Sequence, residues 1–232
     1  MEPVTLITGG STGIGAETAR RLLTRGHRVT VTARRAERLA EFADSTGAAK
    51  DQLMTLPGDT ADAEHVRRAV DLTVQSWGQL DNVVVSAGFS LPGTLADHVP
   101  EAMRSMILTN VLGPALVVQA ALPHLKDTKG RLVLVGSVAG VKNTPGNLYS
   151  VTKWAVHALA ENTRLMATPD GVGVTLVAPG MVDTPFWENR GGRPNAPVMT
   201  AGQIADCVLF ALDQPEGMDI NHIQMRPIGQ VN

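Results

Sequence analysis

Tyr149 and Lys153 form the pair of side chains in this sequence that most directly indicates acid–base chemistry. They lie four positions apart in a segment with helical periodicity, so both side chains share one face of the predicted helix. A free phenol has a pKa of about 10, and a neighbouring ammonium group lowers it because the positive charge stabilises the phenolate. The pair therefore indicates a tyrosine that exchanges protons with a substrate. The same spacing also occurs in surface pairs of amphipathic helices, which leaves a structural role open at this point.

Ser137 and Asn110 are two further polar candidates, and both precede this pair in the chain. Ser137 follows a predicted strand over Arg131–Gly136, and the carboxyl ends of parallel strands line the ligand crevice of an α/β sheet. At that place a hydroxyl group can donate to a substrate oxygen. Asn110 lies in a predicted helical region between two strands, where an amide commonly bonds to the backbone. Singly, each residue has an ordinary structural explanation; together and in this order they support a catalytic site.

A glycine-rich segment over residues 8–15, with the sequence TGGSTGIG, connects the first predicted strand to the first predicted helix. Glycines adopt backbone conformations that other residues avoid, and they let the backbone approach a pyrophosphate closely. The helix that starts near Ile14 offers free N–H groups and the positive end of its dipole to phosphates. An ordinary glycine-rich turn is the alternative, but the strand–loop–helix context favours a dinucleotide. The predicted cofactor contacts in this segment are Gly9, Ser11, Thr12, Gly13, Ile14 and Gly15.

Arg34 and Arg35 follow the second predicted strand, at the place where a dinucleotide site selects its cofactor. An NAD-binding site usually has Asp or Glu there, which binds the ribose 2′-hydroxyl. A carboxylate would repel a 2′-phosphate, whereas a guanidinium group binds one through paired hydrogen bonds. Two arginines without an acid therefore predict NADP(H) as the cofactor. The alternative is that both are solvated residues at the start of a helix, although basic charge there opposes the helix dipole.

Short apolar, β-branched segments alternate with longer segments of helical periodicity, which predicts βαβ units. We therefore predict a single α/β domain over residues 1–232, a Rossmann-type doubly wound parallel sheet with helices on both faces. The predicted strands are Val4–Thr8, Arg28–Thr32, Gln52–Pro57, Asn82–Ser86, Arg131–Gly136, Gly173–Ala178 and Ile220–Arg226. The predicted helices are Ile14–Arg25, Ala36–Thr46, Asp62–Trp77, Glu101–Leu125 with a kink near Gly113-Pro114, Leu148–Ala167, and a last one that runs from a Thr200–Gln203 capping box to about Asp213.

The composition argues against several classes of function. The net charge is −2 and 18% of the residues are charged, so no basic field attracts nucleic acid or an anionic membrane. The single cysteine, Cys207, cannot form a disulfide within the chain, and the histidines are scattered without metal-ligand spacing, so we expect no metal. The N-terminus lacks the features of a signal peptide, and no apolar run reaches the roughly 18 residues that span a bilayer. We expect a soluble, cytoplasmic protein.

Over essentially its whole length, the sequence resembles the short-chain dehydrogenase/reductase family in its compact single-domain form. The resemblance implies an NADP(H)-dependent oxidoreductase that interconverts a carbonyl and an alcohol. The matching motifs occur in the family's order and are Thr8-Gly9-x-x-x-Gly13-x-Gly15, Asp59, Ala87-Gly88, Asn110, Ser137, Tyr149-x-x-x-Lys153, Pro179-Gly180 and Thr184.

The resemblance also implies a role for each matching residue. Tyr149 would protonate the carbonyl oxygen during reduction and accept a proton during oxidation. Lys153 would lower the pKa of this tyrosine and bind the nicotinamide ribose, and Ser137 would polarise the carbonyl. Asn110 would hold a water molecule in a proton relay to the lysine. The other implied cofactor contacts are Asp59 at the adenine with Thr60 beside it, Ala87 and Gly88 at the cofactor's border, Pro179 and Gly180 after a strand, and Val182 and Thr184 at the nicotinamide carboxamide.

Two departures from the family pattern affect the predicted site. The usual Asn-Asn-Ala-Gly segment reads Val85-Ser86-Ala87-Gly88, so the amides that normally brace the sheet and the cofactor loop need a replacement, in part by Ser86. Ser137 precedes Tyr149 by 12 positions, one fewer than is common in the family. The shortened loop Val138–Leu148 borders the substrate site, so we expect this part of the site to have an unusual shape.

Residues 185–199 are predicted to form a short lid over the substrate site. Phe186, Trp187 and Met199 can line an apolar pocket there, or they can pack the loop against the body of the protein. Arg190 and Arg193 can meet an acidic substrate, although exposed loop arginines are usually solvated. A lid of this size fits a small or medium ketone, aldehyde or hydroxy acid.

Two alternatives to a carbonyl–alcohol oxidoreductase stay open. One is a dinucleotide-binding regulatory protein without useful turnover, against which the complete set of four polar residues argues. The other is a nicotinamide enzyme that catalyses dehydration or epimerisation. The C-terminal stretch over residues 223–229 resembles that of reductases related to NADP-dependent 3-hydroxy acid and serine dehydrogenases. The family resemblance further implies a homo-oligomer, dimer or tetramer, with the helix of Tyr149 at one interface, and a small-molecule substrate as partner.

Overall fold

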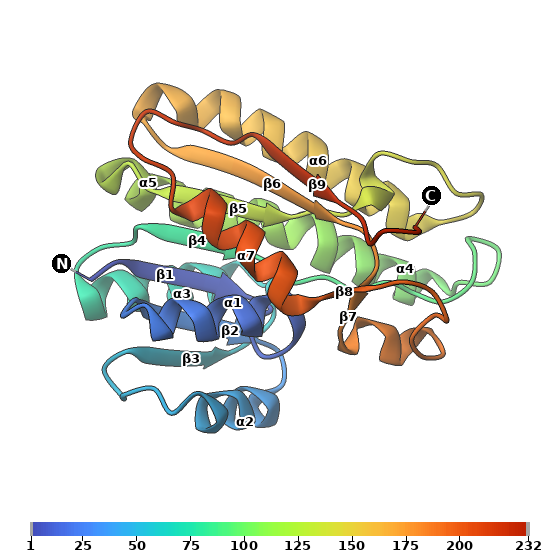
Figure 1. The fold of residues 1–232 in the computed structure, drawn as a ribbon, viewed down its shortest axis with the longest axis horizontal. Helices are drawn as coiled ribbons and strands as arrows, with labels where there is room; N and C mark the ends of the chain where they lie inside the picture. The colour runs from blue at the N-terminus through green and yellow to red at the C-terminus, as the bar shows by residue number, and fades with distance from the viewer. Residues whose placement is uncertain (1, 231–232) are drawn as a thin grey trace.

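A parallel sheet of seven strands forms the centre of the protein, which a computed structural model describes over residues 2–230 (Figure 1). The strands follow the order β3-β2-β1-β4-β5-β6-β9. From β1 the chain first builds outward through β2 and β3, and then returns to build the other half from β4. In such a sheet the ligand crevice opens at the carboxyl ends of the two strands where the order reverses, here β1 and β4. The strands are β1 (Val4–Thr8), β2 (Arg28–Ala33), β3 (Leu53–Pro57), β4 (Asn82–Val85), β5 (Arg131–Val135), β6 (Gly173–Pro179) and β9 (His222–Met225).

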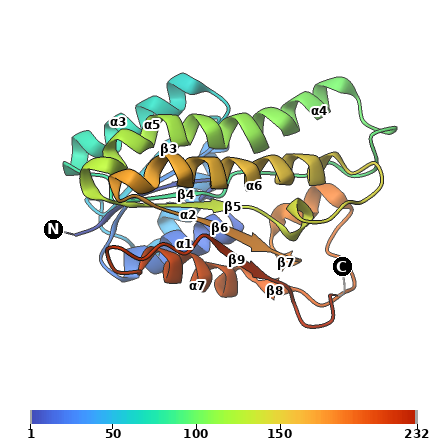
Figure 2. The same ribbon diagram turned by 90° about the horizontal axis from the view of Figure 1, so that it is seen from above.

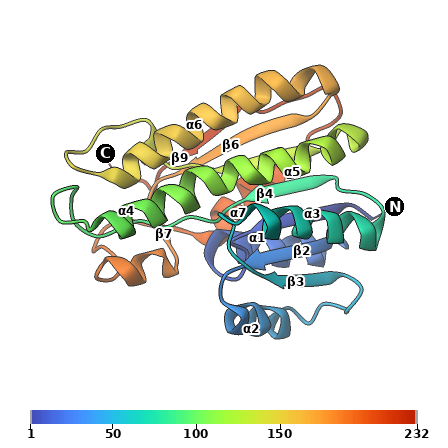
Figure 3. The ribbon, with the colours of Figure 1, turned by 180° about the vertical axis from the view of Figure 1, so that it is seen from behind.

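Helices cover both faces of this sheet and produce three layers, as seen from above in Figure 2. One face carries α1 (Gly13–Thr24), α2 (Ala36–Thr46) and α7 (Ala201–Leu212). Figure 3 shows the opposite face, which carries α3 (Ala63–Trp77), α4 (Pro100–Ile107), α5 (Gly113–Thr128) and α6 (Leu148–Ala167). The predicted Rossmann-type doubly wound α/β fold is confirmed.

Each face of the sheet has its own apolar core, because successive side chains of a strand point to opposite sides. Leu6 of β1 belongs to the core beneath α3, α5 and α6, and its neighbour Ile7 belongs to the core beneath α1, α2 and α7. Val83 and Val84 of β4 divide in the same way. This burial on both sides explains why the central strands β1 and β4 consist mainly of apolar residues, and why the threonines of β1 are buried as well.

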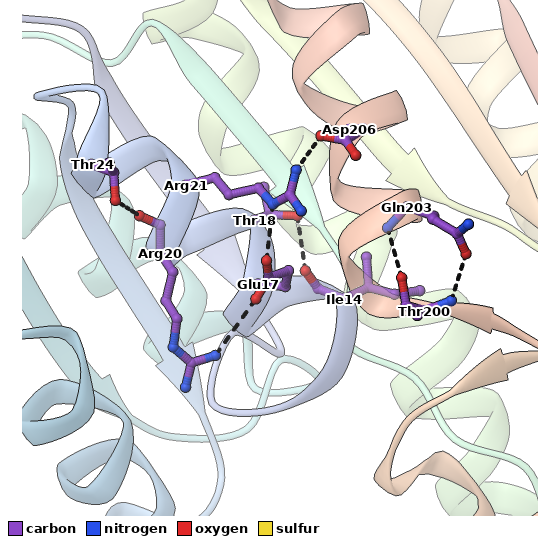
Figure 4. A network of polar contacts seen from close by, with 9 residues as sticks. All are labelled: Ile14, Glu17, Thr18, Arg20, Arg21, Thr24, Thr200, Gln203 and Asp206. Atoms are coloured by element: carbon purple, nitrogen blue, oxygen red, sulfur yellow. Dashed lines mark hydrogen bonds and ion pairs between the residues drawn. The ribbon is translucent and has the colours of Figure 1, made fainter.

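Contacts with α7 hold α1, the helix that starts at the glycine-rich segment, in place (Figure 4). Arg21 of α1 pairs with Asp206 of α7 and with Glu17 one turn earlier in its own helix. The predicted capping box at the start of α7 is confirmed, because Thr200 Oγ1 accepts from the Gln203 N–H and the Gln203 side chain accepts from the Thr200 N–H. The two helices thus form one packed unit behind the ligand crevice.

The predicted elements agree with the structure in type and in position. The boundaries of α2 and α6 match the predicted ones, and most other ends differ by one or two residues. Near Gly113-Pro114, where a kink is predicted, the regular helix is interrupted by a π-helical turn over Leu108–Leu112. The Gly113 N–H there donates to the carbonyl of Leu108, five residues back, and Pro114 has no N–H to give to Asn110.

The segment that was predicted as an irregular lid has local structure of its own. Pro185–Arg190 forms a 3₁₀ helix, and it is bordered by two short parallel strands, β7 (Val182–Asp183) and β8 (Met199–Thr200). Two-residue strands have too little periodicity to be recognised in a sequence. Their pairing brings both ends of the lid together beside the cleft.

The continuous helical run Pro100–Thr128 is the longest apolar helix of the part of the chain that the structure describes, although charged residues interrupt its apolar sequence. It is 29 residues long, and by length and composition alone it would be able to cross a membrane, since its mean hydropathy reaches 1.6. Half of that apolar window is buried within the protein, against the sheet and the neighbouring helices α3 and α6. A buried core helix of a globular domain has the same composition.

Candidate active site

The glycine-rich loop places its backbone against the neighbouring strand end and helix start. Gly9 and Gly13 have φ angles of 66° and 58°, in the left-handed region that favours glycine. A Cβ on Gly9 would lie 2.7 Å from the backbone of Ala87, and one on Gly15 would lie 2.5 Å from the Gly9 carbonyl oxygen. Side chains at these positions would fill the space along the loop, so the glycines keep a main-chain cradle at the start of α1, as phosphate binding requires.

A first cavity of about 110 Å³ lies where strands β1 to β4 end. The hydroxyl groups of Thr8 and Thr60 are buried beside it, and within residues 2–230 they have no hydrogen-bond partner. A buried hydroxyl group without a hydrogen-bond partner destabilises the folded protein unless a ligand or a water molecule bonds to it. This end of the cleft therefore fits a polar ligand such as the adenosine half of a dinucleotide. The predicted cofactor residues that line it are Gly9, Ser11, Arg34, Arg35, Asp59, Thr60, Ala87 and Gly88.

Arg34 and Arg35 line this cavity and also the larger one beside it. The Arg34 guanidinium lies 5.7 Å from the ring centroid of Phe89. In the described part of the chain neither arginine forms an ion pair, whereas Arg38 one turn further pairs with Glu188 at 3.2 Å. Two guanidinium groups without protein counter-ions are therefore available to an anion at the end of β2.

The second cavity, of about 450 Å³, continues from the glycine-rich loop to the ends of β5 and β6. Ser137, Tyr149 and Lys153 all contribute to its wall. The Lys153 Nζ donates to the carbonyl of Val135 at 2.8 Å and lies 5.7 Å from the centroid of the Tyr149 ring. The structure therefore brings the three predicted side chains together at one place, as their order in the chain had suggested.

The protein environment shifts the pKa values of this pair in opposite directions. Burial raises the pKa of Tyr149 to about 12, and a hydrogen bond with the Ser137 side chain and the positive charge of Arg190 act against this rise. Burial lowers the pKa of Lys153 to about 8. At neutral pH the tyrosine therefore holds its proton. That Lys153 lowers the pKa of Tyr149 stays a prediction, because burial dominates the shift here.

Ser137 reaches Tyr149 in spite of the short spacing between them. It begins a 3₁₀ turn over Val138–Gly140, in which its Oγ accepts from the Ala139 N–H at 3.1 Å. Its carbonyl accepts from His157 Nε2 at 3.0 Å, one helical turn beyond Lys153 on α6. The serine is thus held both by its own turn and by α6, and the missing residue is absorbed in the loop that follows.

Asn110 braces the loop after β4 through its side-chain amide. Its Oδ1 accepts from the Phe89 N–H at 3.0 Å, and its Nδ2 donates to the Phe89 carbonyl at 2.8 Å and to Thr152 Oγ1 at 3.0 Å. The amide therefore ties the loop after β4 to α6. It lies outside the lining of both cavities, and its predicted role in a water relay to Lys153 stays a prediction.

The altered segment after β4 is braced through its backbone. Val85 is buried in the core beneath α3 and α5, and the Ser86 N–H donates to the Thr8 carbonyl at 3.2 Å. The Ser86 hydroxyl forms no hydrogen bond to another described residue, so its side chain does not supply the expected replacement. Asn110 supplies the side-chain bracing of this loop instead.

The segment predicted as a lid contacts Tyr149 through aromatic rings. The ring of Phe186 lies 5.6 Å from that of Tyr149 and meets the ring of Trp187 edge to face at 5.4 Å. The Trp187 Nε1 donates to the Val182 carbonyl at 2.8 Å. Arg190 places its guanidinium 5.8 Å from the centroid of the Trp187 ring.

Two residues that were considered for the substrate pocket lie elsewhere. Met199 is buried in the core beneath α1 and α7, so it supports the lid from behind. Arg193 is half exposed and pairs with Asp183 at 2.8 Å. Both positions follow from the pairing of β7 with β8, which sequence periodicity did not reveal.

All the predicted cofactor residues except Gly15, which packs behind the loop, line one or the other cavity. Phe89, Lys142 and Gln230 also line the cavities and were not predicted. Phe89 could have been found, because it directly follows the Ala87-Gly88 motif. Gln230 could not, since only the return of the chain end to the Met181 N–H brings it there. Over residues 2–230 no three His, Cys, Asp or Glu side chains gather where a metal ion would bind.

Known proteins share both the sequence pattern and this fold. The family model described as short chain dehydrogenase matches residues 3–194. An uncharacterized oxidoreductase of Staphylococcus epidermidis is 33% identical over 231 residues, which cover 98% of each chain. An uncharacterized oxidoreductase of Staphylococcus saprophyticus is likewise 33% identical and covers the same share of each chain.

Two solved structures of similar chains contain a nicotinamide cofactor. A serine dehydrogenase in complex with NADP+ superposes with a TM-score of 0.91 at 29% identity, over 99% of this chain and 96% of the other. An alcohol dehydrogenase from the archaeon Thermococcus sibiricus, in complex with 5-hydroxy-NADP, has a TM-score of 0.88 at 28% identity, over 99% and 98% of the two chains. With the glycine-rich cradle and the Tyr149–Lys153 pair, these matches establish that the chain belongs to the short-chain dehydrogenase/reductase family of oxidoreductases.

Proposed function

We propose that this protein is an NADP(H)-dependent oxidoreductase that interconverts a carbonyl and an alcohol, with Tyr149 as the general acid and base. The observation that carries the proposal is the meeting of Ser137, Tyr149 and Lys153 in the wall of one cavity, next to the main-chain cradle of the glycine-rich loop. A protein that only binds a dinucleotide does not need these three groups together. NADP(H), when bound, supplies or accepts the hydride.

The residues of the chain supply the proton and the orientation of the substrate. Tyr149 holds its proton at neutral pH, so it is ready to donate to a carbonyl oxygen during reduction. Ser137, whose hydroxyl lies within hydrogen-bond reach of this tyrosine, would turn its single proton to the substrate oxygen and so orient and polarise the carbonyl. Lys153, with a pKa lowered to about 8, carries a proton that can restore Tyr149. Asn110 holds the loop after β4 in place beside them.

NADP(H) is proposed over NAD(H) because of the two unpaired arginines after β2. Arg34 and Arg35 line both cavities, and no acidic side chain takes the place that a ribose 2′-hydroxyl would use. The bound cofactors named for the serine dehydrogenase and the archaeal alcohol dehydrogenase are also of the NADP type. For the substrate we propose a small or medium ketone, aldehyde or hydroxy acid.

We further propose that the chain forms one domain over residues 1–232 and assembles into a homo-oligomer, a dimer or a tetramer. Support comes from α6, which exposes Val151, Trp154, Leu165 and Met166 on its outer face. Light scattering that shows only the 24.5 kDa monomer at several concentrations would contradict the assembly. We also propose a cytoplasmic location, as expected from the sequence.

The test is to follow the consumption of NADPH and NADH across a panel of aldehydes, ketones, diketones and keto acids. Wild type and Tyr149→Phe are measured in parallel, and the variant keeps the ring that packs on Phe186. We expect turnover with NADPH, weaker turnover with NADH, and a loss of at least about 100-fold in kcat in the variant.

Three other results would speak against the proposal. NADPH binding without turnover of any carbonyl would favour a regulatory protein. A product that forms without net change in the cofactor would favour dehydration or epimerisation. Full activity of Tyr149→Phe would remove the tyrosine from the mechanism.

A further inference from the structure

The charges around the substrate end of the larger cavity all have one sign. Lys142, from the loop after Ser137, and Arg190, from the lid, both line it. Of the residues that the structure places in the lining of this cavity, none is an aspartate or a glutamate. A cavity with cationic side chains and no carboxylate has a positive potential that favours an anionic ligand.

Arg190 is held at the catalytic tyrosine by a chain of ring contacts. Tyr149 packs on Phe186, Phe186 packs on Trp187, and the Arg190 guanidinium lies 5.8 Å from the centroid of the Trp187 ring. The hydrogen bond from Trp187 Nε1 to the Val182 carbonyl fixes the middle of this chain to the body of the protein. The arginine therefore has a defined position on the lid, where its stem is supported and its N–H groups stay available.

Arg193, the other arginine of the lid, has a protein partner for its guanidinium group. Arg193 pairs with Asp183 at 2.8 Å. Arg190, by contrast, forms no ion pair and no hydrogen bond with another described residue. The positive charge of Arg190 acts on the Tyr149 phenol: it lowers the pKa of Tyr149, while burial raises that pKa by more. An anion bound at Arg190 would therefore sit close to the reacting carbonyl.

We propose that Arg190, together with Lys142, binds a carboxylate of the substrate, so that the substrate is a hydroxy acid or the corresponding oxo acid. The inference deepens the proposed function and rests on it. A guanidinium binds a carboxylate through two parallel hydrogen bonds, which orients the molecule as well as holding it. The carboxylate at Arg190 and the carbonyl at Ser137 and Tyr149 then define two fixed points for a short substrate. Neutralisation of Arg190 by the carboxylate also keeps the proton on Tyr149 for reduction.

The first experiment compares acids with their neutral esters. 3-Hydroxybutanoate and 4-hydroxypentanoate, each with its methyl ester, are oxidised with NADP+ by wild type and by Arg190→Gln, Arg190→Lys and Arg193→Gln. We expect wild type to favour the acids in kcat/KM by about tenfold or more. Arg190→Gln should lower this acid-to-ester ratio by about tenfold, mainly through KM, and Arg190→Lys should restore part of it. Arg193→Gln should leave the ratio unchanged.

The second experiment measures binding without turnover. The NADPH-loaded protein is titrated calorimetrically with butanoate and with the isosteric butanamide. Saturable binding of butanoate, weaker binding of butanamide and loss of this difference in Arg190→Gln would support the subsite. Equal binding of both ligands, or of neither, would overturn it.

The two experiments separate the subsite from the proposed function. No Tyr149-dependent turnover of any compound, with butanoate still bound through Arg190, would reject the proposed reaction and keep the anion site. Turnover of the esters as good as that of the acids would reject the subsite and keep the reaction. A weaker affinity for NADPH in Arg190→Gln, with an unchanged acid-to-ester ratio, would assign the arginine to the cofactor and also reject the subsite.

Discussion

The two ends of the cleft are built in different ways. At the end proposed for adenosine, the glycine-rich loop and the residues that end β1 to β4 form the walls, and the hydrogen bonds of the sheet hold their backbone in place. At the substrate end, side chains from α6, from the loop after β5 and from the lid form the walls. The path of the backbone determines the shape of the cavity at the first end. At the second end, the shape is determined by the side chains that α6, the loop after β5 and the lid place there.

Because of this difference, we expect substitutions at the first end to disturb the fold and substitutions at the second end to be tolerated. A change in the glycine-rich loop meets neighbouring backbone, which cannot move without the sheet. A substitution in the lid contacts other side chains and solvent, which can rearrange with little loss of stability. We therefore expect large, general effects at the first end and smaller, selective effects at the second.

Gly15→Ala should have the largest effect at the rigid end. The added Cβ would lie 2.5 Å from the Gly9 carbonyl oxygen, so the loop has to shift. We expect a loss of NADPH affinity of more than about tenfold and a fall in the free energy of unfolding of about 1–3 kcal/mol. Fluorescence titration and thermal unfolding measure the two quantities. Gly217→Ala is the control for NADPH affinity only, because its Cβ would meet no atom within 4 Å, whereas its φ of 85° strains any other residue and will itself lower stability; NADPH affinity that is equal in both variants would contradict this account.

Arg34→Ala and Arg35→Ala should change cofactor preference by about tenfold each. Both residues lie at the cavity without a protein counter-ion, so neither substitution breaks an ion pair within the described part of the protein, although Arg34→Ala also removes the contact with the Phe89 ring. KM for NADPH should rise, and KM for NADH should stay the same. Arg25→Ala removes a surface ion pair with Asp213 and serves as the control for charge. An equal rise of both KM values would show that the arginines do not select the phosphate.

The titration of Tyr149 tests the environment at the variable end. It is the single tyrosine of the chain, so its phenolate absorbance can be followed without interference. Burial raises its pKa to about 12, so the native protein should show almost no phenolate at pH 10, whereas the unfolded chain should be about half ionised there. Ser137→Ala should move the midpoint further up, since the hydrogen bond from Ser137 favours the phenolate.

The pH dependence follows from the same shift. The folded protein binds the phenol proton more tightly than the unfolded chain, so this contribution to stability is complete below about pH 10 and is lost as pH rises towards 12. Tyr149→Phe should lack that loss in alkaline unfolding curves. A native midpoint near 10 would show that the phenol is not shielded from water.

Arg38→Gln or Glu188→Gln should have the smallest effect on stability and on substrate KM. The ion pair between Arg38 and Glu188 connects the cofactor end of the cleft with the lid. It links α2, beyond the two arginines, to the lid at 3.2 Å, and the Glu188 side chain is 55% exposed. Exposed pairs contribute about 1 kcal/mol at most, so the change in Tm should not exceed about 4 °C. KM for the substrate should rise less than about fivefold, and less again at high salt. A larger, salt-independent effect would mean that the pair controls the lid.

Much of the fold and of the cofactor site could be predicted because the signals are local. The strands are apolar because both of their faces are covered, and the glycine spacing follows from one turn between β1 and α1. Ser137, Tyr149 and Lys153 could be predicted together, since a strand end and one helix face are enough to align them. A backbone contact for Asn110 and packing against the body for Met199 were among the interpretations of the sequence, but their partners could not be predicted, because Asn110 lies in a π-helical turn and Met199 in one of two very short strands.

The sequence by itself determined the order of elements, the family and the cofactor loop, because hydrophobic periodicity and glycine spacing are properties of neighbouring residues. The tertiary structure alone decided which arginine of the predicted lid lines the cavity of Tyr149. Arg190 and Arg193 are three positions apart and equal in charge, but one lies against Trp187 in the cavity wall and the other pairs with Asp183. The physical reason is that a side chain's partner depends on segments distant in the sequence, which only the packing of the chain brings together.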